Sequence, residues 1–213
     1  MTRAIKVRLR FAKCGDLRLV SHHDIMRCLE RMLRRARVPM AVSQGFNPRP
    51  KMTFALALGL GIEARREVVD LELSEPLEPS ELLERLSAVA PPGFDWVEAR
   101  ALPADAAAPR PRSVEYQMPV RGDRRNGARA ALEALLAAET WPGVRRRKDR
   151  EQTFDLRPHV VAAGLSDDGM LRFRLAVSPD GSARPEDVLE AIRLRDLLDD
   201  GAVITRHDVD LET

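Results

Sequence analysis

The stretch that decides the fold runs from Asp16 to Gly61 and reads DLRLVSHHDIMRCLERMLRRARVPMAVSQGFNPRPKMTFALALGLG. Its first half predicts a helix from about Ser21 to Arg37, because apolar residues recur near the helical period of 3.6. Ser21 or Asp24 can accept hydrogen bonds from the free N–H groups of the first turn. The loop that follows combines one aromatic, two carboxamides and two cations with glycine and proline, which a plain connection does not need. We therefore expect a functional site in this stretch.

Positive charge is concentrated in the same part of the chain. Residues 13–51 hold nine basic and three acidic residues, a net charge of +6, whereas the whole chain carries +2. A second basic cluster at residues 145–150 holds five cations and one anion. Arginine binds phosphate through its planar fork, so an anionic ligand is expected. On the helix we expect Glu30 and Arg34 to pair, and the other arginines to lack an acidic partner three or four residues away.

The composition is that of an ordinary globular protein, with 213 residues of which 44% are hydrophobic and 32% charged. No apolar run approaches the roughly 18 residues of a membrane-spanning helix, and the first residues lack the apolar core of a signal peptide. Cys14 and Cys28 form neither a disulfide framework nor a recognised metal motif. We expect a cytoplasmic protein without a membrane segment, a metal site or a cofactor.

Hydrophobic periodicity predicts the order β-α-β-β-α-β in residues 1–102, which is the order of a ferredoxin-like split unit. The expected elements are a strand over Ile5–Phe11, a helix over Ser21–Arg37, strands over Met52–Leu60 and Glu67–Leu73, a helix over Pro79–Ala90 and a strand over Phe94–Leu102. The expected core consists of Leu9, Phe11, Ile25, Leu29, Phe54, Leu56, Leu71 and Leu82.

The same order returns after residues 103–112, PADAAAPRPR, whose composition predicts a linker with few contacts. The expected elements beyond it are strands over Val114–Val120, Thr153–Leu165, Met170–Val177 and Ala202–Leu211, and helices over Gly127–Glu139 and Arg184–Ile192. The second of these strands is expected to be broken by Pro158. The sequence therefore predicts an α+β protein of two tandem ferredoxin-like (βαββαβ) domains, residues 1–102 and 113–213.

His22 and Asp24 form a candidate catalytic pair. His22 would act as acid or base, Asp24 would orient it, and Lys51 or Arg49 would stabilise a developing anion. The alternative is a helix cap with a partly exposed histidine. The connection from Val38 to Pro50 is long enough to return along the helix, so His22, Asp24, Asn47 and Lys51 are expected to share one pocket.

Three motifs carry a resemblance to a known family. KCGDLRLVSHHDIMRCLERMLRRA with SQGFNPRPKMTFALALGLGIE, then DLRPHV, then GSARPEDVLEAI, resemble the bacterial radical-SAM-linked proteins. The resemblance covers nearly the whole chain and implies a small protein that works beside a cobalamin-binding radical SAM enzyme. This chain has no CxxxCxxC motif for an iron–sulfur cluster of its own. The family's usual His-Leu-Asp is His22-His23-Asp24 here, which gives His22 and Asp24 more weight than His23.

The first interpretation is an RNA-binding accessory protein that presents a structured RNA to a partner radical SAM enzyme, in RNA modification or maturation. The alternatives are a protein-interaction module that docks that enzyme without RNA, and an RNA-processing enzyme that uses His22. The expected RNA contacts are Arg27, Arg31, Arg34, Gln44, Phe46, Asn47, Arg49 and Lys51, with Arg145, Arg146, Arg147 and Lys148 as a second basic patch.

Overall fold

A computed structural model describes residues 5–147, 150–178 and 181–212 of the chain. The protein is a mixed α/β structure with four α-helices and mostly antiparallel strands among these residues. The chain divides into two compact units. Unit 1 comprises Met1–Pro111 with Leu211–Thr213, and unit 2 comprises Arg112–Asp210.

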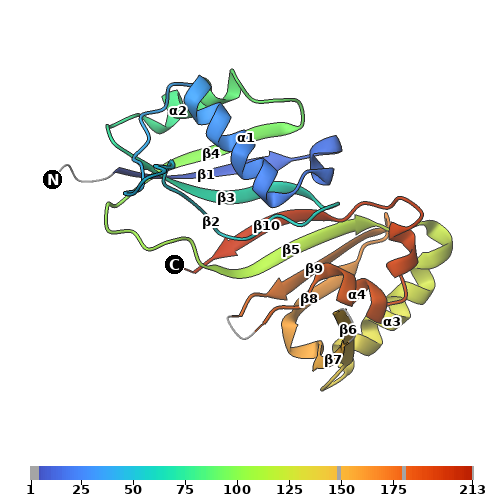
Figure 1. The fold of residues 1–213 in the computed structure, drawn as a ribbon. Helices are drawn as coiled ribbons and strands as arrows, with labels where there is room; N and C mark the ends of the chain where they lie inside the picture. Colours follow the sequence, from blue (N-terminus) through green and yellow to red (C-terminus); the bar gives the residue numbers. More distant parts are fainter. Residues whose placement is uncertain (1–4, 148–149, 179–180, 213) are drawn as a thin grey trace. The chain divides into compact units, whose positions relative to one another are not determined.

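Unit 1 has the expected element order β-α-β-β-α-β. Its elements are β1 (Ile5–Lys13), α1 (His22–Arg35), β2 (Met52–Phe54), β3 (Glu63–Leu73), α2 (Pro79–Ser87) and β4 (Phe94–Leu102). The strands lie in the order β4-β1-β3-β2, with every neighbouring pair antiparallel. Both helices lie on one face of this sheet (Figure 1), where they bury a single apolar core.

Period-2 alternation decides which strand residues enter that core. Val7, Leu9 and Phe11 of β1 are fully buried, and each lies opposite a residue that also points inward from β3. The helix contributes its predicted apolar face, with Ile25 and Leu29 completely buried. The predicted core is confirmed for six of its eight members, and Phe54 packs against it. Leu56 is only half-buried, because the chain leaves the sheet before it.

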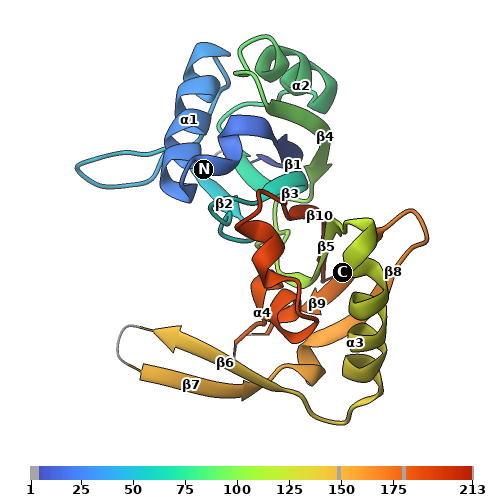
Figure 2. The same ribbon diagram turned by 90° about the vertical axis from the view of Figure 1, so that its right-hand side faces the viewer.

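Unit 2 contains β5 (Pro111–Pro119), α3 (Arg125–Ala137), β6 (Pro142–Arg147), β7 (Arg150–Asp155), β8 (Val160–Leu165), β9 (Met170–Ala176), α4 (Pro185–Ala191) and β10 (Thr205–Leu211). Four strands lie in the order β10-β5-β9-β8, and β6 and β7 form a separate two-stranded sheet. Figure 2 shows this hairpin extending outward from the rest of the unit.

Several predicted boundaries are wrong. The strand expected over Met52–Leu60 ends at Phe54, and β3 begins at Glu63 rather than at Glu67. The break expected at Pro158 is present, as a 3-10 turn over Arg157–His159 between β7 and β8, but β7 begins at Arg150 rather than at Thr153, and β6 was not expected. Pro158 sits inside that turn, where its missing N–H removes no ladder bond.

The segment 103–112 has no regular secondary structure before Pro111, but it makes several tertiary contacts. The ammonium of Lys6 donates to the carbonyl of Ala106 at 2.6 Å, and the N–H of Glu212 donates to the carbonyl of Arg110 at 2.8 Å. Pro109 is buried, and β5 begins at Pro111. Composition alone does not reveal such tertiary contacts.

In the described part of the chain, no helix is long and apolar enough to cross a membrane.

Candidate functional site

Ser21 and Asp24 fix the start of α1. The Ser21 hydroxyl accepts from the Asp24 N–H at 3.2 Å and donates to the Asp24 carboxylate at 2.7 Å. This hydroxyl contact, aided by Arg27, holds the pKa of Asp24 below its usual value. Arg27 donates to the other Asp24 oxygen at 3.2 Å. The Asp24 carboxylate therefore stabilises the first turn of α1.

The expected charge pairing on α1 is wrong. Asp24 pairs with Arg27, three residues later, because the cap at Ser21 fixes the carboxylate above that turn. Glu30 and Arg34 do not form an ion pair within the described residues. Arg27 is thus partly neutralised, although an exposed pair of this kind is weak and can be exchanged for another anion.

His22 lies in the first turn of α1 and is half-buried. Its Nδ1 accepts a hydrogen bond from the Leu58 N–H at 3.4 Å. Its ring meets the Phe54 ring edge to face, with centroids 5.1 Å apart. A ring that accepts at Nδ1 carries any proton of its neutral form on Nε2. The contacts of His22 thus fix its orientation against the segment that follows β2.

A buried lysine lies behind this segment. Lys13, at the end of β1, is fully buried, and its ammonium donates to the carbonyls of Gly59 at 3.2 Å and Arg18 at 3.5 Å. The Gly61 N–H also donates to the Arg18 carbonyl, at 2.7 Å. Lysine is almost never fully buried unless it is paired, so this position is exceptional.

A buried glutamate lies on the same face of the sheet. Glu67 of β3 is 1% exposed and sits opposite Phe11 in the strand register. Lys13 is two positions beyond Phe11 and lies opposite Ala64, across a shift in the register, so both charged residues belong to the same end of the β1–β3 pair. Sequence reasoning missed both residues. The signal was present, because Lys13 continues the inward series 7, 9, 11 and Glu67 begins the inward series 67, 69, 71, 73.

The face of α1 opposite to its buried apolar residues is basic and open to solvent. Arg31, Arg34 and Arg35 are exposed, as are Arg37 and Arg49 further along the chain. Within the described residues, none of these five side chains takes part in an ion pair. Arg37 follows the end of the helix with a positive φ of 51°, where glycine is the usual residue. The arginine is kept there despite backbone strain.

Residues 41–51 form a narrow hairpin, which we call the arm. Its two sides are joined by an antiparallel bridge between Val42 and Pro50 and by the Ser43 N–H, which donates to the Arg49 carbonyl at 2.9 Å. Figure 2 shows the arm projecting from unit 1 between α1 and β2. At its tip the Phe46 side chain is fully exposed.

The structure groups the candidate residues into two sets. His22 contacts Phe54 and Leu58, whereas the Lys51 ammonium lies 3.0 Å from the Glu72 carboxylate at the base of the arm. Gln44, Phe46, Asn47 and Arg49 are exposed on the arm itself. A pocket shared by His22, Asp24, Asn47 and Lys51 stays a prediction. The described residues contain no cluster of His, Cys, Asp and Glu suited to a metal ion.

The second basic patch lies on the β6–β7 hairpin. Arg145 contacts the Asp187 carboxylate at 2.6 Å, and its guanidinium lies 4.2 Å from the centre of the Phe154 ring. These contacts make Arg145 a structural link between the hairpin and α4. Arg146 and Arg147 follow it along β6, and Lys148 lies outside the described residues.

Comparison with known proteins identifies relatives but no activity. A family model described as "Uncharacterized protein conserved in bacteria (DUF2344)" matches residues 6–185. No curated protein matches the chain. Among solved structures, an unknown protein from Galdieria sulphuraria is 14% identical over 99% of each chain, with a TM-score of 0.30. That score is too low to support an argument about fold or function.

Proposed function

This chain belongs to a bacterial family of uncharacterized proteins, DUF2344, and from its surface we propose that it is an RNA-binding accessory protein. The partner would be a radical SAM enzyme, as the sequence resemblance implies, and the process would be RNA modification or maturation. We also propose that both units are ferredoxin-like. The strand orders β4-β1-β3-β2 and β10-β5-β9-β8 support this, with the β6–β7 hairpin as an insertion into the second unit.

One observation carries the proposal. From Arg31 to Ile62 the chain contains no acidic residue, and it contains six basic ones. Five of these are exposed arginines that form no ion pair among the described residues, and the sixth is Lys51. Uncompensated like charges on neighbouring turns destabilise a helix. A polyanion relieves that repulsion, and arginine binds its phosphates bidentately.

The arm supplies contacts of a different kind. Phe46 offers a free ring face on which an unpaired base can stack, and such stacking contributes about 1–3 kcal/mol per base. Gln44 and Asn47 flank it with carboxamides that can pair with base edges. The combination of a basic helix face and an aromatic tip favours single-stranded or looped RNA over a regular duplex.

Arg37→Gly gives a clean test of the electrostatic part. Glycine adopts a φ of 51° without strain, so folding stability should not fall. Affinity for a labelled stem–loop RNA, measured by fluorescence anisotropy, should fall severalfold at low salt. The log–log dependence of affinity on salt should flatten by about 0.7, the share of one phosphate contact.

Arg193→Gly is the matched control. Arg193 is the other described non-glycine residue with a positive φ, 60°, and it belongs to unit 2. The same exchange there removes one cation and the same kind of strain. Equal losses of RNA affinity in both variants would reject a specific surface on α1, and the absence of RNA binding at low salt would reject the function.

The interaction-module alternative depends on the same arm. A fully exposed phenylalanine also fits an apolar pocket of a partner protein. Phe46→Ala separates the two functions when RNA affinity and co-purification of the radical SAM enzyme are measured in parallel. Loss of the enzyme with unchanged RNA affinity would favour the module.

A further inference from the structure

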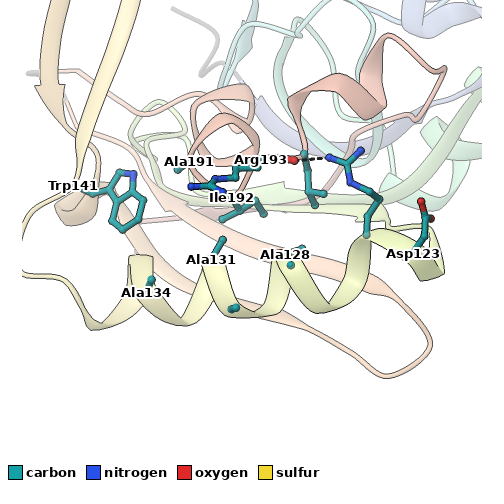
Figure 3. Close-up of a pocket in the computed structure, with 12 residues that line it drawn as sticks. Asp123, Ala128, Ala131, Ala134, Trp141, Ala191, Ile192 and Arg193 are labelled. Carbon is teal, nitrogen blue, oxygen red and sulfur yellow. Dashed lines mark hydrogen bonds between the residues drawn. The ribbon is translucent and has the colours of Figure 1, made fainter.

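Unit 2 contains a groove that the proposed function does not use. A hollow of about 600 Å³ lies between α3 and the end of α4. Figure 3 shows its floor of small side chains, Ala128, Ala131 and Ala134 from α3, facing Ile192, with the Trp141 indole closing one end. This volume is within the range of pockets that bind compact apolar groups. We call this hollow the Trp141 groove.

The backbone around Trp141 is held firmly. The Trp141 N–H donates to the Asp155 carboxylate at 2.8 Å, and the Trp141 carbonyl accepts from the Leu156 N–H at 2.8 Å. Across the groove, Arg124 donates to the Arg193 carbonyl at 2.7 Å, the bond drawn in Figure 3. The two sides of the groove are therefore fixed in the free chain, which lowers the entropic cost of filling it.

The rim beside Trp141 is acidic. A second hollow of about 780 Å³ adjoins the first and shares Trp141, Ala191 and Arg193 with it. Glu186 and Glu190 of α4 line this second hollow, and within the described residues neither belongs to an ion pair. Two cations line it as well: Arg195, which pairs with Asp199 at 3.6 Å, and the exposed Arg193. The two glutamates outnumber Arg193, so the rim disfavours the phosphates of an RNA strand.

The arm has the complementary chemistry. It presents one fully exposed aromatic ring, and it carries Arg49 and Lys51 without any acidic residue. A phenylalanine fits an apolar groove closed by an indole, where aromatic pairs gain about 0.5–1.5 kcal/mol beyond burial. A cation three residues from that ring can meet the carboxylates on the rim.

We propose that the arm of one copy inserts Phe46 into the Trp141 groove of a second copy, with Arg49 against Glu186 and Glu190. Reciprocal insertion closes a dimer with two identical contacts. This inference rests on the proposed function in one respect only. An arm seated in a groove cannot stack on RNA, so dimer formation and RNA binding compete for Phe46.

Sedimentation equilibrium of the full chain without RNA tests the dimer by itself. The wild type should show a mass rising with concentration from 23.9 kDa toward twice that value. Phe46→Ala and Trp141→Ala should each remain monomeric over the same range. Trp141 is half-buried, so Glu190→Arg serves as a second groove variant. Glu190 is exposed on α4, and its exchange should abolish association without disturbing the fold.

Mixing two variants identifies the contact. Phe46→Ala retains an intact groove and Glu190→Arg retains an intact arm, so an equimolar mixture can form one contact although neither variant associates alone. That heterodimer should be weaker than the wild-type dimer by about 10²-fold or more, because the second contact is missing.

Three results would overturn the inference. The first is a wild type that stays monomeric at every concentration. The second is a Phe46→Ala or Glu190→Arg chain that associates as the wild type does. The third is a Trp141→Ala chain that loses RNA affinity while its self-association is unchanged, which would indicate that the groove binds RNA. A wild type that dimerises but binds no RNA would reject the proposed function without contradicting the dimer.

Discussion

Lys13 shows how a residue can be missed although the alternation of its strand points to it. Alternation along β1 places positions 7, 9, 11 and 13 on one face, and the structure buries all four. Its length and charge make lysine an unexpected continuation of an apolar series. The same holds for Glu67, which precedes three apolar inward residues of β3. The expected strand ended at Phe11 and Glu67 was not assigned to the core, so neither position was predicted, and the carbonyl contacts of Lys13 depend on tertiary structure.

Lys13→Met should destabilise the fold strongly. The change removes two hydrogen bonds to backbone carbonyls and leaves Glu67 buried beside an apolar side chain. Leaving buried polar groups without their hydrogen-bond partner costs about 1–3 kcal/mol. Urea unfolding measures the loss, and the double variant Lys13→Met, Glu67→Leu should lose less than the sum of the two single variants. Strict additivity would show that the two charges are not coupled.

Cys14 should be a slow thiol. Burial raises the pKa of its side chain, although the Arg65 guanidinium, 3.2 Å from Sγ, acts in the opposite direction. The thiolate fraction at neutral pH is therefore smaller than that of an unperturbed cysteine. In a Cys28→Ser background, alkylation by iodoacetamide at pH 7 should be slower than that of free cysteine and should accelerate at higher pH. Fast modification at pH 7 would show that Arg65 dominates.

At the scale of elements, helices and long alternating strands were predictable and tertiary insertions were not. Both ends of α1 lie within two residues of the expected bounds, because the cap residues and the apolar face indicate the same helix. The chain after Phe54 reads as a strand, yet it leaves the sheet there and returns only at Glu63, after Gly61 adopts a φ of 79°. The hairpin strand β6 contains one exposed valine, and its arginines gave the pattern of a charged loop.

His22→Ala should loosen the 55–61 segment without unfolding unit 1. The change removes the acceptor of the Leu58 N–H and the ring that packs on Phe54. Loss of such a bond costs about 1 kcal/mol, which lowers Tm by a few degrees. Hydrogen exchange at the Leu58 amide should accelerate more than exchange in α1. Uniform acceleration throughout the unit would instead assign His22 to the global core.

At the scale of the whole molecule, the small net charge conceals a separation. The net charge of +2 combines a basic stretch in unit 1, a basic hairpin in unit 2 and an acidic remainder. Counting charges along the sequence predicted this separation. The sequence could not show which cations are free of ion pairs. Arg27, Lys51 and Arg145 pair with carboxylates that only the folded chain brings close to them.

The separation predicts binding to heparin, a polyanion, at neutral pH despite the low net charge. Arg31→Glu should elute at clearly lower salt than the wild type, because it reverses one charge within the uncompensated stretch. Arg172→Glu on β9 changes the net charge equally and provides the control, with elution close to that of the wild type. Equal shifts for both variants would mean that net charge alone governs retention.

Because Phe46 at the tip of the arm is exposed, the rate of proteolytic cleavage after it indicates whether the tip is free or covered. Chymotrypsin cleaves after large aromatic residues that it can reach in extended backbone, and of the six phenylalanines only Phe46 is exposed, whereas Phe54 and Phe154 are half-buried and the other three are buried. Brief digestion should therefore begin after Phe46, leaving two pieces that stay associated through the sheet and core of unit 1. Whatever covers the tip, RNA or a groove, should slow that first cut. The rate of a single proteolytic event thus becomes a direct footprint of the arm.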